Sequence, residues 1–354
     1  MAGIVDVDLH HEVADWGAVA PYVPSGLRWR VKSKSGPPLA RHGLKPVGAP
    51  RSVAATDPAS VKEQFIEPRG IDVAILTGSL LSLGVQPNPD LAAAIARGVN
   101  DWTLETWIRP FNCYKGSILI AQQDPQQAVA EIDRLGDDPG MVQVLMGSAS
   151  EAPFGRRAFH PIYEACVRHN LTLALHMGGE GTGISSPATA VGHPTTYFEW
   201  YGSLPQSYMA HIMSMVTEGV FERFPTLKVV LHDAGVFWLP HIMWRFDKNW
   251  KAQRSETPWV KQPPSRYILD HFYLTTYLLE AAPEPRYLHQ VLEMIDADRT
   301  LLFSSSFPNW ALGDPFEMIR DIPDHLRPRV LSENAVAVYG ERLFVPHQAA
   351  GAGA

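Results

Sequence analysis

The feature that most constrains this chain is a regular alternation of short apolar runs with longer amphipathic segments. Eight apolar runs of strand length lie at 3–10, 71–78, 114–121, 141–148, 171–178, 227–234, 272–277 and 299–306 of the 354 residues. Helical patterns separate several of them, at 125–135, 161–170, 207–224 and 285–295. This alternation is typical of parallel strands covered by helices. Eight such units predict an α/β fold of the closed (β/α)8 type, a TIM barrel.

The spacing between the runs predicts one domain over residues 1–346 with two long loops. Residues 11–70 are rich in Pro, Gly, Ser and Lys and form an insertion after the first strand, which we expect to lie over the barrel mouth. Residues 179–205 form a long loop in the same relative position after the fifth strand. The small, featureless residues 347–354 are predicted to be a disordered tail.

Composition and charge exclude several classes of partner. The formal net charge is −7 and no run of Lys and Arg occurs, so we expect no nucleic-acid partner. The first residues acquire charge at once, which predicts neither a signal peptide nor a membrane anchor. Cys113 and Cys166 have no CxxC spacing, so neither a disulfide framework nor a thiolate metal site is indicated, and a cytoplasmic location is favoured.

Polar residues gather at the carboxyl ends of the predicted strands, which form the mouth of a parallel barrel. They are Asp6, Asp8, His10, His176, His232, Asp233 and the serines at 304–306. Because side chains alternate along a strand, Asp6, Asp8 and His10 share one face. Buried polar groups are costly unless something binds them, and imidazoles with carboxylates suit zinc, iron or manganese. A divalent metal site is therefore predicted; histidines bonded to the backbone of the core are the alternative.

Six segments together carry a family resemblance: VDVDLH, GSILIAQQDPQQAVAEI, HPIYEACVRHNLTLALHMGG, EGVFERFPTLKVVLHDAGVFWLP, RTLLFSSSFPNW and ENAVAVYG. In them the chain resembles the second amidohydrolase family, which includes aminocarboxymuconate-semialdehyde decarboxylase and the resorcylate decarboxylases. The resemblance covers nearly the whole chain. It implies a distorted, metal-bearing (β/α)8 barrel, a small-molecule substrate and a homodimer.

The resemblance also implies a set of metal ligands. The strand-one motif of the family, an acid or His, one spacer and a His, falls on Asp8 and His10, and its strand-five His falls on His176. Its strand-six ligand falls on Asp233, because the glycine of the following turn then matches; a shift of one residue would bring in His232 instead, and both stay open. Zinc is the first expectation, manganese and iron are alternatives, and loss of the metal is a further one.

The strand-eight motif departs from the family pattern. The family reads S-D-[YF]-P-H where residues 305–309 read SSFPN, so that the usual Asp is Ser306 and the usual His is Asn309. A serine hydroxyl is neutral at pH 7, although it can bond a metal-bound water or a substrate oxygen. Proton transfer is then expected from His211 or His232, because imidazole titrates near neutrality. For His211, a packing role on a helix is the alternative.

Side chains beside these strand ends are predicted to contact the substrate; they are Phe237, Trp238, Phe307, Asn309 and Trp310. Aromatic walls suit a flat substrate, although core packing is the alternative for such residues. The first functional hypothesis is a metal-dependent, non-oxidative decarboxylase (carboxy-lyase) of a small cyclic or aromatic carboxylic acid. One alternative is a metal-dependent hydrolase of an amide, lactone or related bond. Another is a repurposed, metal-free biosynthetic enzyme for cyclisation, dehydration or rearrangement, or a binding protein without catalysis.

Overall fold

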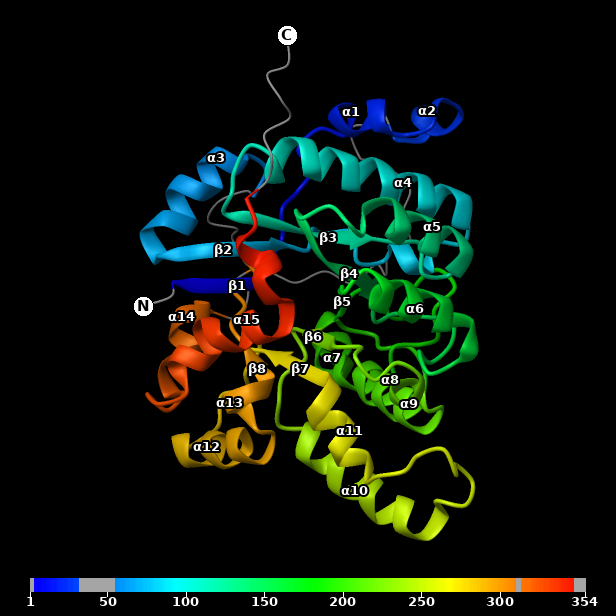
Figure 1. The fold of residues 1–354 in the computed structure, drawn as a ribbon, viewed down its shortest axis with the longest axis vertical. Helices are drawn as coiled ribbons and strands as arrows, with labels where there is room; N and C mark the ends of the chain where they lie inside the picture. The colour runs from blue at the N-terminus through cyan, green and yellow to red at the C-terminus, as the bar shows by residue number, and fades with distance from the viewer. Residues whose placement is uncertain (1–2, 32–54, 310–312, 347–354) are drawn as a thin grey trace.

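A computed structural model describes residues 3–31, 55–309 and 313–346. Within them, eight parallel strands form one sheet in the order of the sequence, with helices around it (Figure 1). The strands are β1 Ile4–Leu9, β2 Ile71–Leu76, β3 Tyr114–Leu119, β4 Met141–Gly147, β5 Thr172–His176, β6 Val229–His232, β7 Phe272–Thr275 and β8 Leu301–Leu302. Each lies inside one of the predicted apolar runs, which confirms the TIM-barrel fold.

The barrel closes between β1 and the segment that follows β8. Val7 donates its backbone N–H to the carbonyl of Phe303 at 3.0 Å, and Ser306 donates to the carbonyl of Asp8 at 2.9 Å. The regular strand β8 is only two residues long, so most of this closure is made by irregular backbone. The eighth strand is therefore the distorted part of the barrel, and the three serines lie in it.

The helices that follow β2 include the predicted ones at 125–135, 161–170 and 285–295, each reproduced to within two residues, and others that the sequence analysis does not bound. They are α4 Pro89–Thr103, α5 Pro125–Leu135, α6 His160–Arg168, α7 Tyr197–Ser203, α8 Pro205–Thr217, α9 Val220–Arg223, α10 Leu239–Gln253, α11 Pro264–His271, α12 Pro285–Met294, α13 Ala297–Thr300, α14 Pro315–Met318 and α15 Asn334–Tyr339. Asp124 caps α5 by accepting from the backbone of Gln127, with Pro125 in the first turn. The predicted helix 207–224 is two helices, because Gly219 takes a left-handed φ of 71° between them.

The described ends of the first insertion contain the short helices α1 Trp16–Val19, α2 Arg28–Val31 and α3 Pro58–Val61. α1 packs against α4, outside the barrel wall (Figure 1). Residues 32–54 and the predicted tail 347–354 lie outside the described residues. The expected cover over the mouth therefore falls partly on residues that the structure does not describe, and it stays a prediction.

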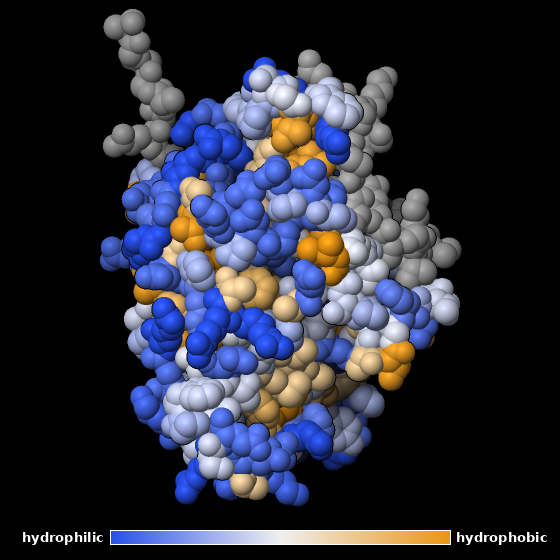
Figure 2. Space-filling model, turned by 90° about the vertical axis from the view of Figure 1, so that its right-hand side faces the viewer, coloured by the Kyte–Doolittle hydropathy of each residue, from blue (hydrophilic) through white to orange (hydrophobic). Residues whose placement is uncertain are grey.

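The barrel interior below the mouth is packed with apolar side chains. Alternating residues of the strands, such as Val5, Val7, Val73 and Ile75, form one cluster with residues of α15. In a barrel of this type the chemistry takes place at the carboxyl ends of the strands. On the face shown in Figure 2, hydrophilic residues predominate and apolar ones occur in separate small groups. No helix in the described ranges has the length and apolar character needed to cross a membrane.

Candidate metal centre

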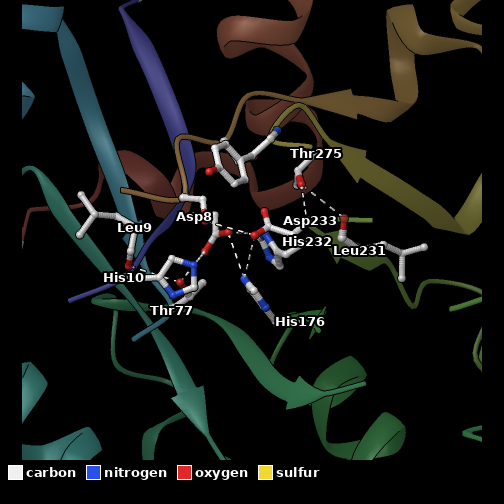
Figure 3. A network of polar contacts seen from close by, with 12 residues as sticks. Asp8, Leu9, His10, Thr77, His176, Leu231, His232, Asp233 and Thr275 are labelled. Carbon is white, nitrogen blue, oxygen red and sulfur yellow. Dashed lines mark hydrogen bonds and ion pairs between the residues drawn. The ribbon is translucent and has the colours of Figure 1, made fainter. Parts of the chain in front are cut away.

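Four side chains of the predicted ligand set meet at the carboxyl ends of the strands (Figure 3). Asp8 lies on β1, His10 just after it, His176 at the end of β5 and Asp233 directly after β6. Each offers one nitrogen or oxygen, and these four atoms all lie within 4.8 Å of one another. All four residues are buried. The barrel thus brings together the residues that the sequence predicts as metal ligands.

Polar atoms in this cluster lack hydrogen-bond partners. Oδ2 of Asp8, Nε2 of His10, Nε2 of His176 and Oδ1 of Asp233 are buried and accept or donate no hydrogen bond among the described residues. Leaving a buried polar atom unpaired costs about 1–3 kcal/mol. Their convergence is explained if they share a ligand, and two carboxylates with two imidazoles are a donor set that suits a divalent transition metal. The residues therefore fit the predicted cation.

Both imidazoles are oriented by backbone carbonyls. Nδ1 of His10 lies 2.5 Å from the carbonyl oxygen of Gly78, and Nδ1 of His176 lies 2.8 Å from that of Met177. A carbonyl oxygen only accepts, so each Nδ1 carries a hydrogen, and in the neutral ring each Nε2 has a free lone pair. This arrangement is the one found when a histidine ligates a metal, because the second nitrogen fixes the tautomer and the ring.

Asp8 is the electrostatic centre of the cluster. Its Oδ1 accepts the hydroxyl hydrogen of Thr77, and its Oδ2 lies 3.3 Å from Nε2 of His176 and 3.8 Å from Nδ1 of His232. Burial opposes its ionisation, but the imidazoles around it outweigh burial and hold the pKa of Asp8 well below its usual value. For His176, burial lowers the pKa, but the neighbouring carboxylates, Asp8 foremost, together outweigh burial, and the pKa rises to about 9. Binding of a cation would displace the protons held in this cluster.

His232 and Asp233, between which the sequence does not decide, both face the cluster. Asp233 has a left-handed φ of 55°, which breaks the alternation of side chains at the end of β6. The turn is held because the backbone N–H of Asp233 donates to Oγ1 of Thr275 at 3.1 Å, and the hydroxyl of Tyr208 donates to the carbonyl of His232 at 2.5 Å. Adjacent residues can therefore serve one site.

The ring of His232 also lies in the cluster. It stacks on His176 with the ring centroids 5.7 Å apart. It is fully buried, and neither ring nitrogen has a hydrogen-bond partner among the described residues. Burial lowers the pKa of His232 to about 4. Its two nitrogens are thus left for a role that the protein's own contacts do not supply.

The serines after β8 have separate partners. Ser306 has a left-handed φ of 49°, and its hydroxyl donates to Oδ2 of Asp233 at 3.1 Å. Ser305 donates its hydroxyl to Oδ2 of Asp6 at 2.5 Å and its backbone N–H to Oδ1 of Asp6 at 2.9 Å. Asp6 is thereby used in closing the barrel, although it shares a strand face with Asp8 in the sequence pattern.

His211, the other predicted proton carrier, lies on α8 with both ring nitrogens engaged by the backbone. Its Nε2 donates to the carbonyl of Ser148 at 2.7 Å, and its Nδ1 accepts from the N–H of Phe154 at 3.2 Å. The ring also stacks on Phe154, with centroids 3.8 Å apart. Burial lowers the pKa of His211 to about 4. These contacts favour the packing role over proton transfer.

The predicted substrate contacts lie in varied surroundings. Trp238 is buried and donates Nε1–H to the carbonyl of Ala234 at 2.7 Å. Phe307 is buried and stacks on Phe65 at 4.1 Å between centroids. The carbonyl of Asn309 accepts from the hydroxyl of Tyr277 at 2.6 Å.

Two further residues complete the predicted set. Phe237 is half-buried and directs its backbone N–H to Glu280. Trp310 lies outside the described residues. Contact of these side chains with a substrate stays a prediction.

Several residues of the site do not appear in the sequence prediction. Thr77 and Thr275 end the apolar runs of β2 and β7, and the rule of polar residues at strand ends would have found both. Tyr201 of α7 lies in the second long loop, and no sequence pattern marks it. It is half-buried; burial raises its pKa, and the nearby charge of Asp233 raises it further.

Comparison with known proteins agrees with this geometry. Residues 7–340 match the family model of the amidohydrolases, Amidohydro_2. Gamma-resorcylate decarboxylase of Polaromonas sp. (strain JS666 / ATCC BAA-500) is 27% identical over 259 residues, which are 69% of this chain and 75% of that protein. The 2-amino-3-carboxymuconate-6-semialdehyde decarboxylase of Dictyostelium discoideum is 22% identical over 287 residues, 79% of this chain and 76% of that protein.

A solved structure shows the same fold over almost the whole chain. It is that of dihydroxybenzoic acid decarboxylase from Polaromonas sp. JS666 with bound manganese and the inhibitor 2-nitroresorcinol. The TM-score is 0.68 at 20% identity, covering 98% of this chain and 100% of that chain. Because the family model spans most of the sequence and the barrel is present, this chain belongs to the amidohydrolase family.

Proposed function

We propose that this protein is a metal-dependent, non-oxidative decarboxylase of a small cyclic or aromatic carboxylic acid. The observation that carries the proposal is the convergence of buried, unpartnered ligand atoms from Asp8, His10, His176 and Asp233. The two curated relatives named above are both decarboxylases, and the names of their substrates describe unsaturated carboxylic acids. The bound inhibitor in the related structure, 2-nitroresorcinol, is a flat aromatic molecule.

The four ligands would hold a divalent cation, with zinc and manganese as the first candidates. Manganese is a candidate beside zinc because the related decarboxylase structure contains manganese. When bound, the cation supplies a Lewis acid that orients a carboxylate and a neighbouring oxygen. The chain itself contributes fixed ligands: carbonyl oxygens hold the two imidazoles, and Thr77 holds Asp8. The ligands are thereby oriented before any substrate arrives.

His232 is the group to which we assign proton transfer. Replacement of a carboxylate on a ring carbon by hydrogen requires one proton at that carbon as CO2 leaves. Imidazole can release a proton from one nitrogen and accept one at the other. Both nitrogens of His232 lack partners among the described residues, and the ring lies inside the cluster. His211 is less suited, because the backbone occupies both of its nitrogens.

Metal analysis with an activity screen tests the proposal. The purified protein should contain close to one divalent metal per chain, and a panel of hydroxybenzoic acids should include one that releases CO2. His10→Ala should lose both properties, whereas His289→Ala, an exposed histidine away from the cluster, should keep both. Hydrolysis of lactones or amides without CO2 release would favour the hydrolase alternative. Full activity of metal-free protein would reject the metal-dependent mechanism.

The role of His232 is tested separately from metal binding. His232→Gln should retain the metal and lower the turnover number by about 10²–10⁴-fold, the usual contribution of a general acid or base. If His232→Gln loses the metal as completely as His10→Ala does, His232 is a metal ligand instead. A homodimer and a cytoplasmic location stay predictions, and light scattering of the purified protein measures the first of them.

A further inference from the structure

Ser306 contacts one of the proposed ligands directly. Its hydroxyl donates to Oδ2 of Asp233 at 3.1 Å, and both side chains are buried. Oδ2 of Asp233 also lies 3.7 Å from Nε2 of His176, so this carboxylate reaches from the end of β6 into the ligand cluster. Among the described residues, the hydroxyl of Ser306 is the donor to the side chain of Asp233.

The backbone directs the two side chains toward each other. Asp233 and Ser306 have left-handed φ values of 55° and 49°, a conformation that non-glycine residues adopt rarely and that Asp and Asn tolerate best. Each is held in it by a backbone hydrogen bond: Asp233 donates to Thr275, and Ser306 donates to the carbonyl of Asp8. The barrel backbone therefore fixes the direction in which each of the two side chains leaves the chain.

We propose that Ser306 is the positioning residue of the metal ligand Asp233, and that the two positions form an exchangeable pair able to supply the fourth ligand from either strand end. The inference rests on the proposed metal centre. A donor on a ligating carboxylate orients it and tunes its charge, as outer-sphere partners of metal ligands do. A carboxylate at position 306 would be longer than the serine side chain and would extend into the space that Asp233 fills.

Exchange of the acid between the two positions tests the inference. Asp233→Gly removes the carboxylate without backbone strain, because glycine accepts a left-handed φ. The double variant Asp233→Gly/Ser306→Asp restores one acid in the space thus opened. We expect Asp233→Gly to bind Zn²⁺ or Mn²⁺ more weakly by over about 100-fold, Ser306→Ala by about 10–100-fold, and the double variant to recover to within about tenfold of the wild type.

Two readouts besides activity separate positioning from general damage. Chelator competition gives the Kd of each metal, and the visible absorption of the Co²⁺-loaded protein reports the ligand set, which the double variant should restore. Ser332→Ala is the matched control, because Ser332 is a buried serine whose hydroxyl has no partner among the described residues. It should leave both readouts unchanged.

The possible outcomes are distinguishable. An unchanged Kd for Ser306→Ala, or a double variant that binds no better than Asp233→Gly, overturns the inference. If His10→Ala abolishes metal binding but the variants at 233 and 306 leave the Kd unchanged, the proposed metal centre is supported. The proposal that positions 233 and 306 exchange the fourth ligand is then wrong. A wild-type protein that binds none of these cations rejects the metal centre and the inference together.

Discussion

Nε2 of His176 lies 3.3 Å from Oδ2 of Asp8, across the mouth of the barrel between β5 and β1. Neither atom has a hydrogen-bond partner among the described residues. Their ring and carboxylate are nevertheless fixed from behind, by the carbonyl of Met177 and the hydroxyl of Thr77. A nitrogen lone pair and a carboxylate oxygen that are held at such a distance form two corners of a ligand cage.

The hydroxyl of Thr77 should tune the metal centre, because it donates to Oδ1 of Asp8 from the end of β2. Thr77→Val keeps the shape of the side chain and removes the donor. We expect the Kd for Zn²⁺ to rise by about 10–100-fold, the usual cost of losing a partner of a metal ligand. Thr77→Ser, which keeps the hydroxyl, should stay near the wild-type Kd. Chelator competition measures both, and equal Kd values for the Val variant and the wild type would contradict this role.

Removal of the metal should lower the thermal stability of the protein. A ligand that binds only the folded state stabilises it by about 4 kcal/mol when its free concentration is 1,000 times the Kd. Calorimetry before and after treatment with dipicolinate, and again after addition of Zn²⁺, should show Tm falling and recovering. The variant His176→Ala lacks one of the four ligands, so its Tm should change little on treatment with dipicolinate or on addition of Zn²⁺. The same Tm with and without metal in the wild type would argue against a metal bound in the folded state.

The buried imidazole of His211 should make stability depend on pH. Burial lowers its pKa from 6.5 to about 4 in the folded protein. Between these values the unfolded chain binds more protons, so the stability contributed by the neutral ring is complete above pH 6.5 and is lost as the pH falls toward about 4. Nuclear magnetic resonance of labelled histidine rings should show His211 neutral at pH 5.5. A protonated ring at that pH would contradict the packing role.

Gly235 should tolerate no side chain. It has a left-handed φ of 65°, and an added Cβ would lie 2.4 Å from Oε1 of Glu280. That carboxylate accepts from the backbone N–H groups of Val236 and Phe237 and so fixes the turn after β6. Gly235→Ala should lower the free energy of unfolding by about 1–3 kcal/mol through backbone strain and displacement of Glu280.

Gly202 provides the control for this substitution. A Cβ there meets no atom within 4 Å, and the residue lies in α7. Gly202→Ala should therefore leave the protein equally or more stable, because alanine favours helix over glycine. Urea denaturation measures both variants. Equal stability of Gly235→Ala and the wild type would show that the turn after β6 can relax.

Short apolar runs and their spacing sufficed to predict the eight strands, because a buried parallel strand needs only apolar residues over a few positions. Polar residues at the ends of these runs likewise sufficed to nominate Asp8, His10 and His176, since all strands of a parallel barrel end at one mouth. The resemblance to the amidohydrolases supplied Asp233 as the fourth.

Local backbone conformation and contacts between distant elements decided how the residues at the strand ends are oriented and which partners they have. The alternation rule allowed either His232 or Asp233 to face the mouth, but the left-handed φ at Asp233 brings both there. The partner of Ser306 and the two backbone bonds of His211 come from elements far apart in the chain. Sequence periodicity describes a regular strand or helix, so it determined where the elements lie. The contacts made where a strand ends depend on single dihedral angles and on neighbours from other strands, which only the folded barrel specifies.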